Sequence, residues 1–154
     1  MKKTAPKNNQ KQQNIQISPK KTLLEQLYDR GWLDFPKSPY TSLARLRVGL
    51  KLMYNYQIIQ RSNLHSGFIV NSRIDIALSL DARIYNDSLQ FYRNCLRIVP
   101  AEFWPVVRLI CLEEKMPEIP SELSERQQAH INYLYKIDLC RGLDRIISDT
   151  TKNR

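Results

Sequence analysis

Glycine is scarce in this sequence, and its scarcity limits the kinds of site that the chain can form. Only four glycines occur in 154 residues, and each stands on its own. A loop that cradles phosphate through its backbone N–H groups needs clustered glycines. A nucleotide-binding loop of that type is therefore excluded.

Metal-ligating residues are also few. Cys95, Cys111 and Cys140 are widely spaced among apolar residues, and His65 and His130 lie far from them and from each other. No pair has the spacing of a CxxC or HxxxH motif, so the sequence predicts no metal site. We expect reduced, buried thiols.

Two further absences bear on activity and location. The acid pairs at 113–114 and 122–125 lie in and around a proline-bearing linker, where solvated charge is the usual explanation, so we expect no enzyme and no cofactor. No apolar run approaches the ~18 residues that a membrane-spanning helix needs. No apolar stretch follows the basic start of the chain, so we expect a cytoplasmic protein without membrane contact.

Positive charge is unevenly distributed along the chain, which has a formal net charge of +9. Residues 1–21 contain six lysines and no acid, and residues 35–74 contain six bases and no acid. Residues 75–154 contain eleven bases against twelve acids. A localised basic region is the footprint of a polyanionic partner. The bases of the second region are Lys37, Arg45, Arg47, Lys51, Arg61 and Arg73.

The spacing of apolar residues predicts the organisation of the chain. Residues 1–21 are too poor in hydrophobic side chains to offset their ordering entropy, so we expect a disordered basic tail. Residues 22–148 show helical spacing and no strand-type alternation, and residues 149–154 are expected to be a short C-terminal tail. The sequence predicts an all-α fold, a single compact bundle of about five helices.

The first expected helix, about 23–30, has clear signals at both ends. Thr22 and Glu25 have the spacing of a capping box, and Gly31 is a typical C-terminal stop. The aromatic link that follows, from Trp32 to Phe35, is expected to anchor this helix on the core rather than to bind a ligand.

The second expected helix, from Ser42 to about Arg61, is the most informative segment. Its apolar side chains cover more than half of its circumference. Arg45 falls inside this apolar arc, where a guanidinium must find a partner or extend to solvent. Gly49 in a helix interior costs about 1 kcal/mol relative to Ala, which indicates close packing by another helix.

Three more helices are expected, separated from the second by a loop. Ser124 and Gln127 have the spacing of a capping box for the last helix. Apolar residues at 3–4 spacing predict a buried stripe in both long helices. The loop is expected at 62–71, and the first and last of the three helices at 74–99 and 124–147. The helix between them is expected to begin between residues 101 and 105 and to end near residue 112. The residues expected in the stripes are Ile74, Ala77, Leu78, Ile84, Tyr85, Leu89, Tyr92, Cys95, Leu96, Val99, Ile131, Leu134, Tyr135, Leu139, Leu143 and Ile146.

Several stretches resemble a domain family of unknown function from alphaproteobacteria. Residues 47–56, RVGLKLMYNY, are similar to that family's R-x-G-x-x-L-x-x-D-Y helix. Residues 104–113, WPVVRLICLE, are similar to its W-x-V-V-x-x-V-C-x-E helix, and residues 141–146, RGLDRI, to its x-G-L-D-x-L ending. The resemblance covers roughly residues 41–148.

Members of this family occur alone or behind helix-turn-helix domains in transcriptional regulators, with a C-terminal part like sigma region four. The resemblance therefore implies regulation of transcription, with phage-like genes among the candidates. Pro117 and Pro120 stand where the family has the first of its two short C-terminal helices. For this reason we place no base contacts on the last helix.

Taken together, these patterns favour a non-enzymatic regulatory protein of transcription that binds nucleic acid, expected to be DNA. Arg47, Lys51 and Arg61 would contact phosphates, which position a protein without reading sequence. Asn55 belongs to the same basic helix face, and Tyr54 would stack or form a hydrogen bond.

Two other interpretations stay open. In the first, the basic face is only the solvated outer side of an amphipathic helix. Alternatively, the protein is an adaptor without direct DNA contact, bound to RNA polymerase or another transcription protein or part of a phage-derived assembly. The wide apolar arc at 42–61 supports an adaptor, because a small domain has few elements to cover it. The DNA site, the oligomeric state and the share of binding due to the tail are not determined by the sequence.

Overall fold

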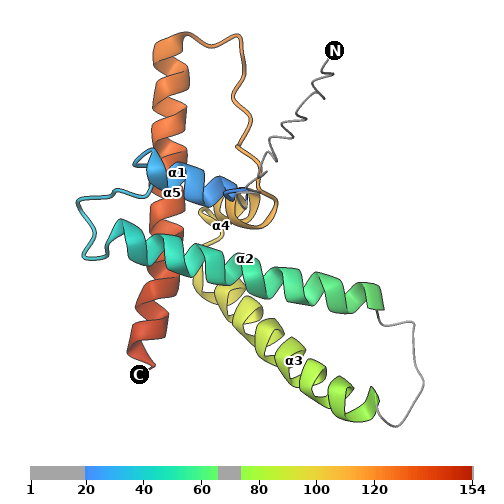
Figure 1. Ribbon diagram of the computed structural model, residues 1–154. Helices are drawn as coiled ribbons and strands as arrows, with labels where there is room; N and C mark the ends of the chain where they lie inside the picture. Colours follow the sequence, from blue (N-terminus) through green and yellow to red (C-terminus); the bar gives the residue numbers. More distant parts are fainter. Residues whose placement is uncertain (1–19, 66–73, 154) are drawn as a thin grey trace, which may run out of the picture.

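The computed structural model describes residues 20–65 and 74–153, with the side chains of residues 20–62 and 82–153. Within these ranges the chain is all-α, as predicted. Figure 1 shows that α2 crosses α5 and that α3 folds back along α2. The short helices α1 and α4 lie beside the crossing. No helix in the described ranges is both long and apolar enough to cross a membrane. The elements are α1 (Leu23–Asp29), α2 (Ser42–His65), α3 (Ile74–Ile98), α4 (Trp104–Val107), the π-helical turn η1 (Arg108–Leu112) and α5 (Glu125–Lys152).

The predicted signals at the ends of α1 and at the start of α5 are confirmed. The Thr22 hydroxyl accepts a hydrogen bond from the backbone N–H of Glu25, and the Glu25 carboxylate accepts one of 2.7 Å from the backbone N–H of Thr22. Gly31 follows α1 with a φ of +80°, a conformation that favours glycine. Ser124 and Gln127 form the equivalent capping box on α5.

Two helices extend beyond their expected ends. α2 continues to His65, so the first part of the expected loop at 62–71 is helical, while residues 66–71 lie outside the described residues. α5 continues to Lys152, into the segment expected to be a tail from residue 149. Neither extension contains Gly or Pro, so no residue there stops the helix. Near the end of α5 the Thr150 hydroxyl donates to the carbonyl oxygen of Ile146 at 3.1 Å.

The fourth expected helix is present, but its second half is wound differently. It starts at Trp104, with Pro105 in its first turn, and passes into the π-helical turn η1. The wider winding of η1 brings Ile110 and Cys111 into the core, where both are fully buried.

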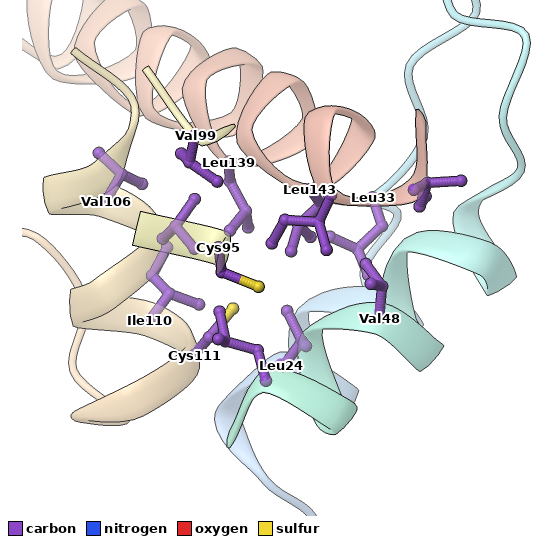
Figure 2. Close-up of a cluster of buried hydrophobic side chains, with 14 of the residues drawn as sticks. Leu24, Leu33, Val48, Cys95, Val99, Val106, Ile110, Cys111, Leu139 and Leu143 are labelled. Atoms are coloured by element: carbon purple, nitrogen blue, oxygen red, sulfur yellow. The ribbon is translucent and has the colours of Figure 1, made fainter. Parts of the chain in front are cut away.

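The core lies where α1, α2, α4, η1, α5 and the C-terminal end of α3 meet (Figure 2). Two glycines allow the closest approaches. A Cβ at Gly49 would overlap the side chain of Leu24 from α1, and a Cβ at Gly142 would overlap that of Val107 from α4. The close packing predicted at Gly49 is thus confirmed. Other core side chains are Leu27, Leu33, Val48, Leu52, Cys95, Val99, Leu139, Leu143 and Ile146.

Three residues expected in the core stripes are exposed instead. Ile84 is 50% exposed, Leu96 42% and Leu134 45%. Only one end of α3 and one half of α5 reach the core, so Ile84 and Leu134 lie beyond the elements that could cover them. Leu96 lies at the core end of α3, but it is turned about 100° around the helix from the buried Cys95. The expected stripe residues Ile74, Ala77 and Leu78 lie outside the described side chains.

The apolar arc of α2 is mostly covered. Val48, Leu52 and Ile59 are buried, and α2 packs against α1, α3, η1 and α5. Its width therefore no longer supports an adaptor function.

Candidate nucleic-acid interface

The outer side of α2 carries the basic stripe that the sequence predicted. α2 contains no Asp or Glu in its 24 residues. Arg47, Lys51 and Arg61 are exposed, and Tyr54, which is 63% exposed, lies between them. Successive residues of an α-helix turn by about 100°, so these four positions share one side of α2. None of the three cations forms an ion pair within the part of the chain that the structure describes.

Asn55 lies differently from the other four predicted site residues. It is half-buried, and its Nδ2 donates a hydrogen bond of 2.7 Å to the carbonyl oxygen of Lys51, one turn earlier in α2. This bond holds the side chain against its own helix. Asn55 is therefore less well placed for contact with DNA than its neighbours are.

Lys51 is positioned by α3. Its Nζ lies 4.6 Å from the ring centroid of Phe91, within the range of a cation–π interaction. Phe91 also lines a shallow hollow together with Asp87 and Asn94, and the Asn94 Nδ2 donates a hydrogen bond of 2.8 Å to Asp149. Carboxylates therefore border the basic stripe on its α3 side. No sequence signal pointed to Phe91, because its contact depends on how α2 and α3 pack.

Arg45 binds the inner side of α2 to the rest of the fold. Its side chain is only 1% exposed. Its Nε and Nη2 donate to the two carboxylate oxygens of Asp144 at 2.7 and 3.2 Å, and its Nη1 donates to the carbonyl oxygen of Leu33 at 2.7 Å. These bonds hold one side of α2 on α5 and on the aromatic link. Arg47 lies on the roughly opposite side of the helix and is turned to solvent.

The aromatic link is anchored on the core, as predicted. Leu33 is fully buried, and the ring centroid of Phe35 lies 5.9 Å from the Cζ of Arg45 and 6.0 Å from that of Arg141. The carbonyl oxygen of Trp32 accepts a hydrogen bond of 3.4 Å from the thiol of Cys140. The link therefore supports Arg45 rather than forming a ligand site of its own.

The buried pair also changes the charge count of the basic region at 35–74. The sequence predicted that Arg45 needs a partner, and the partner is Asp144, 99 residues further along the chain. Arg45 is therefore neutralised, and Arg73 lies outside the described residues. The remaining bases of the region are all exposed: Lys37, Arg47, Lys51 and Arg61.

The three cysteine thiols are free and buried, as predicted. Burial raises the pKa of Cys95 and of Cys111 to about 12 and the pKa of Cys140 to about 11. Figure 2 shows the sulfur atoms of Cys95 and Cys111 within the apolar cluster. A thiol in such surroundings is a poor nucleophile and metal ligand, because both roles need the thiolate.

We expect the native thiols to react slowly with Ellman's reagent at pH 8, and all three to react rapidly once the protein is unfolded in guanidinium. The pKa of an unfolded thiol is about 8.5, below the folded values. The stability that buried thiols contribute is therefore complete below about pH 8.5 and falls as the pH rises toward the folded pKa values. Rapid labelling of the native protein would contradict this burial.

No group of histidine, cysteine and acidic side chains that could hold a metal ion occurs among the described residues. His130 is exposed on α5, and the side chain of His65 lies outside the described ones. Comparisons with protein-family models, with curated proteins and with solved structures gave no match. The family resemblance of residues 41–148 therefore stays a prediction.

Proposed function

We propose that this protein binds duplex DNA through the outer side of α2, as a non-enzymatic regulator of transcription. The observation that supports the proposal is the exposed, acid-free stripe with Arg47, Lys51 and Arg61. At 1.5 Å per residue the stripe is about 21 Å long. A duplex of that length carries about twelve phosphate charges, so each of the three cations has phosphates within its reach along the stripe.

The three cations would contact phosphates, which fix the orientation of a protein on DNA. Tyr54 would add a hydrogen bond or a stacking contact, because it is 63% exposed. Phe91 would keep the Lys51 ammonium group in place. The link to transcription depends on the sequence resemblance.

The lysine-rich N-terminus must be separated from the domain in any test. Its lysines alone could bind DNA without sequence preference. A chain that lacks residues 1–19 still contains every described residue. It keeps Lys21, whose Nζ is 2.7 Å from the Asp29 carboxylate.

We expect the salt dependence of DNA binding to report the α2 contact. In a chain without residues 1–19, Arg47→Ala with Lys51→Ala should lower the slope of log K against log salt by about 2, since each phosphate contact contributes about 0.9. Fluorescence anisotropy of a labelled duplex, titrated at several salt concentrations, measures this slope. The helix content should not change, because both residues are exposed and Ala favours helix.

The matched control removes two charges from another surface. Arg93 and Arg97 of α3 have the same i, i+4 spacing and are also exposed. Arg93→Ala with Arg97→Ala should leave the slope close to that of the parent chain. Equal slopes for the α2 double variant and its parent, or no binding at low salt without residues 1–19, would rule out the α2 interface.

A further inference from the structure

The first half of α5 lies outside the core. No residue from Glu125 to Asp138 is buried, whereas six residues of the second half are. In Figure 1 this half extends past α1 at the top of the view, beside the linker that leads into it. Two side chains of α5 hold the linker. Gln128 donates a hydrogen bond of 3.0 Å to the carbonyl oxygen of Leu123, and the Tyr135 hydroxyl donates one of 3.4 Å to the carbonyl oxygen of Glu118.

Large apolar side chains lie on the side of this half-helix that faces away from the linker. Tyr133 is 55% exposed, Leu134 is 45% exposed and Ile137 is half-buried. At about 100° per residue these three share one side, roughly opposite Gln128 and Tyr135. No other element among the described residues buries Tyr133 or Leu134, and contiguous exposed apolar side chains are typical of interaction sites.

Positive charge bounds this apolar surface at both ends. Arg126 lies at one end of the surface and Arg141 at the other. Both are exposed on the same side of α5. Glu125 precedes Arg126 and is turned about 100° around the helix from it. Asp138 lies at the margin and is half-buried, and burial raises its pKa despite the nearby Arg141 guanidinium. The exposed His130 lies on the same side between Arg126 and Tyr133, so the apolar part of the surface runs from Tyr133 to Ile137 and the two ends are cationic.

We infer that this surface, defined by Arg126, Tyr133, Leu134, Ile137 and Arg141 and called the α5 strip, docks an acidic amphipathic helix of a partner protein. An apolar side chain gains free energy against another apolar surface but gains little from a phosphate backbone. The charges at the two ends select acidic residues in the partner. About 22 Å separates the ends of the strip, which fits about four turns of a docked helix.

The strip is distinct from the DNA-binding stripe on α2. It lies on a different helix and contains no residue of that stripe. Its function as a docking surface therefore does not depend on the proposed DNA binding, and one molecule could hold DNA and a partner protein at the same time.

A pair of synthetic peptides tests the inference on the full-length protein. One is a helical 21-residue peptide with leucines at heptad spacing and glutamates beside them; the other has lysine in place of each glutamate. We expect the fluorescein-labelled acidic peptide to bind and the basic one not to bind. Tyr133→Ala with Leu134→Ala should weaken binding of the acidic peptide by about tenfold or more, as truncation of central interface anchors does. Arg126→Glu with Arg141→Glu should abolish it.

Three control measurements separate the possible outcomes. Ile84→Ala removes an apolar side chain of α3 that is 50% exposed and should leave peptide binding unchanged. Arg47→Ala with Lys51→Ala should also leave it unchanged, so that failure of the DNA proposal and failure of this one appear in different variants. Circular dichroism checks that the strip variants keep their helix content.

Peptide binding that is insensitive to Tyr133→Ala with Leu134→Ala would overturn the inference, because other basic surfaces would then hold the acidic peptide. Equal binding of the two peptides would overturn it as well. A loss of duplex DNA binding in Tyr133→Ala with Leu134→Ala would also overturn it, since that result would assign the strip to nucleic acid.

Discussion

Asp144→Ala should destabilise the protein by about 3–5 kcal/mol, the largest effect that we expect from a single substitution. The Arg45 guanidinium is 1% exposed, and Asp144 supplies the charge that neutralises it through two hydrogen bonds. Without Asp144 a cation would stay buried with the carbonyl oxygen of Leu33 as its hydrogen-bond acceptor and no charge to neutralise it. Equilibrium unfolding in urea, followed by circular dichroism at 222 nm, gives the change in the free energy of unfolding.

Two further variants show whether the loss comes from the unpaired charge. Arg45→Met with Asp144→Leu removes both charges and should recover much of the stability, because apolar replacements of a buried ion pair are often tolerated. Asp29→Ala breaks the exposed pair with Lys21 and should leave the unfolding midpoint unchanged. A loss below about 1 kcal/mol in Asp144→Ala would mean that Arg45 reaches solvent easily and does not orient α2.

Gly142→Ala should also destabilise the protein, although Ala favours helix by about 1 kcal/mol. Its Cβ would overlap a methyl group of Val107 and approach the Cβ of Phe103 to 3.4 Å. Val107 is fully buried and, as a β-branched residue, has little rotamer freedom to move aside. Overpacking of this kind costs about 1–3 kcal/mol, so we expect a net loss, measured by thermal and urea unfolding.

Gly49→Ala provides the matched comparison. Its Cβ would overlap the end of the flexible Leu24 side chain, whereas Cys111 and Leu143 would stay at ordinary contact distances of 3.5 and 3.6 Å. Leu24 can yield more easily than Val107, so Gly49→Ala should destabilise the protein by less than Gly142→Ala does. The reverse order would show that the crossing of α2 with α1 is tighter than that of α5 with α4.

The helix boundaries show where local sequence signals suffice. Thr22 with Glu25 and Ser124 with Gln127 were recognisable because a capping box acts within a single turn. The ends of α2 and α5 were placed too early, because polar residues after the last apolar position do not stop a helix. The π-helical winding of η1 was not predicted either, since it depends on what the turn packs against.

Exposure of apolar residues was harder to predict than helix position. Ile84 and Leu134 have helical spacing that fits a core stripe, and both are exposed. Apolar periodicity identifies which side of a helix is apolar, but not whether another element covers it. The α5 strip was therefore not recognised in the sequence, where Leu134, one of its residues, was expected in the core.

The basic stripe on α2 depends partly on the sequence alone and partly on the tertiary structure. The sequence by itself determined that a helix without acids runs from Ser42 to about Arg61, that Arg47, Lys51, Tyr54 and Arg61 share one side of it, and that Arg45 needs a partner. Only the tertiary structure decided that Asp144 is this partner and that the stripe consequently faces solvent. It also decided that Phe91 lies beneath Lys51. The physical reason is range: helix periodicity and capping act over a few residues, whereas burial and pairing depend on segments that the chain brings together from 99 residues apart.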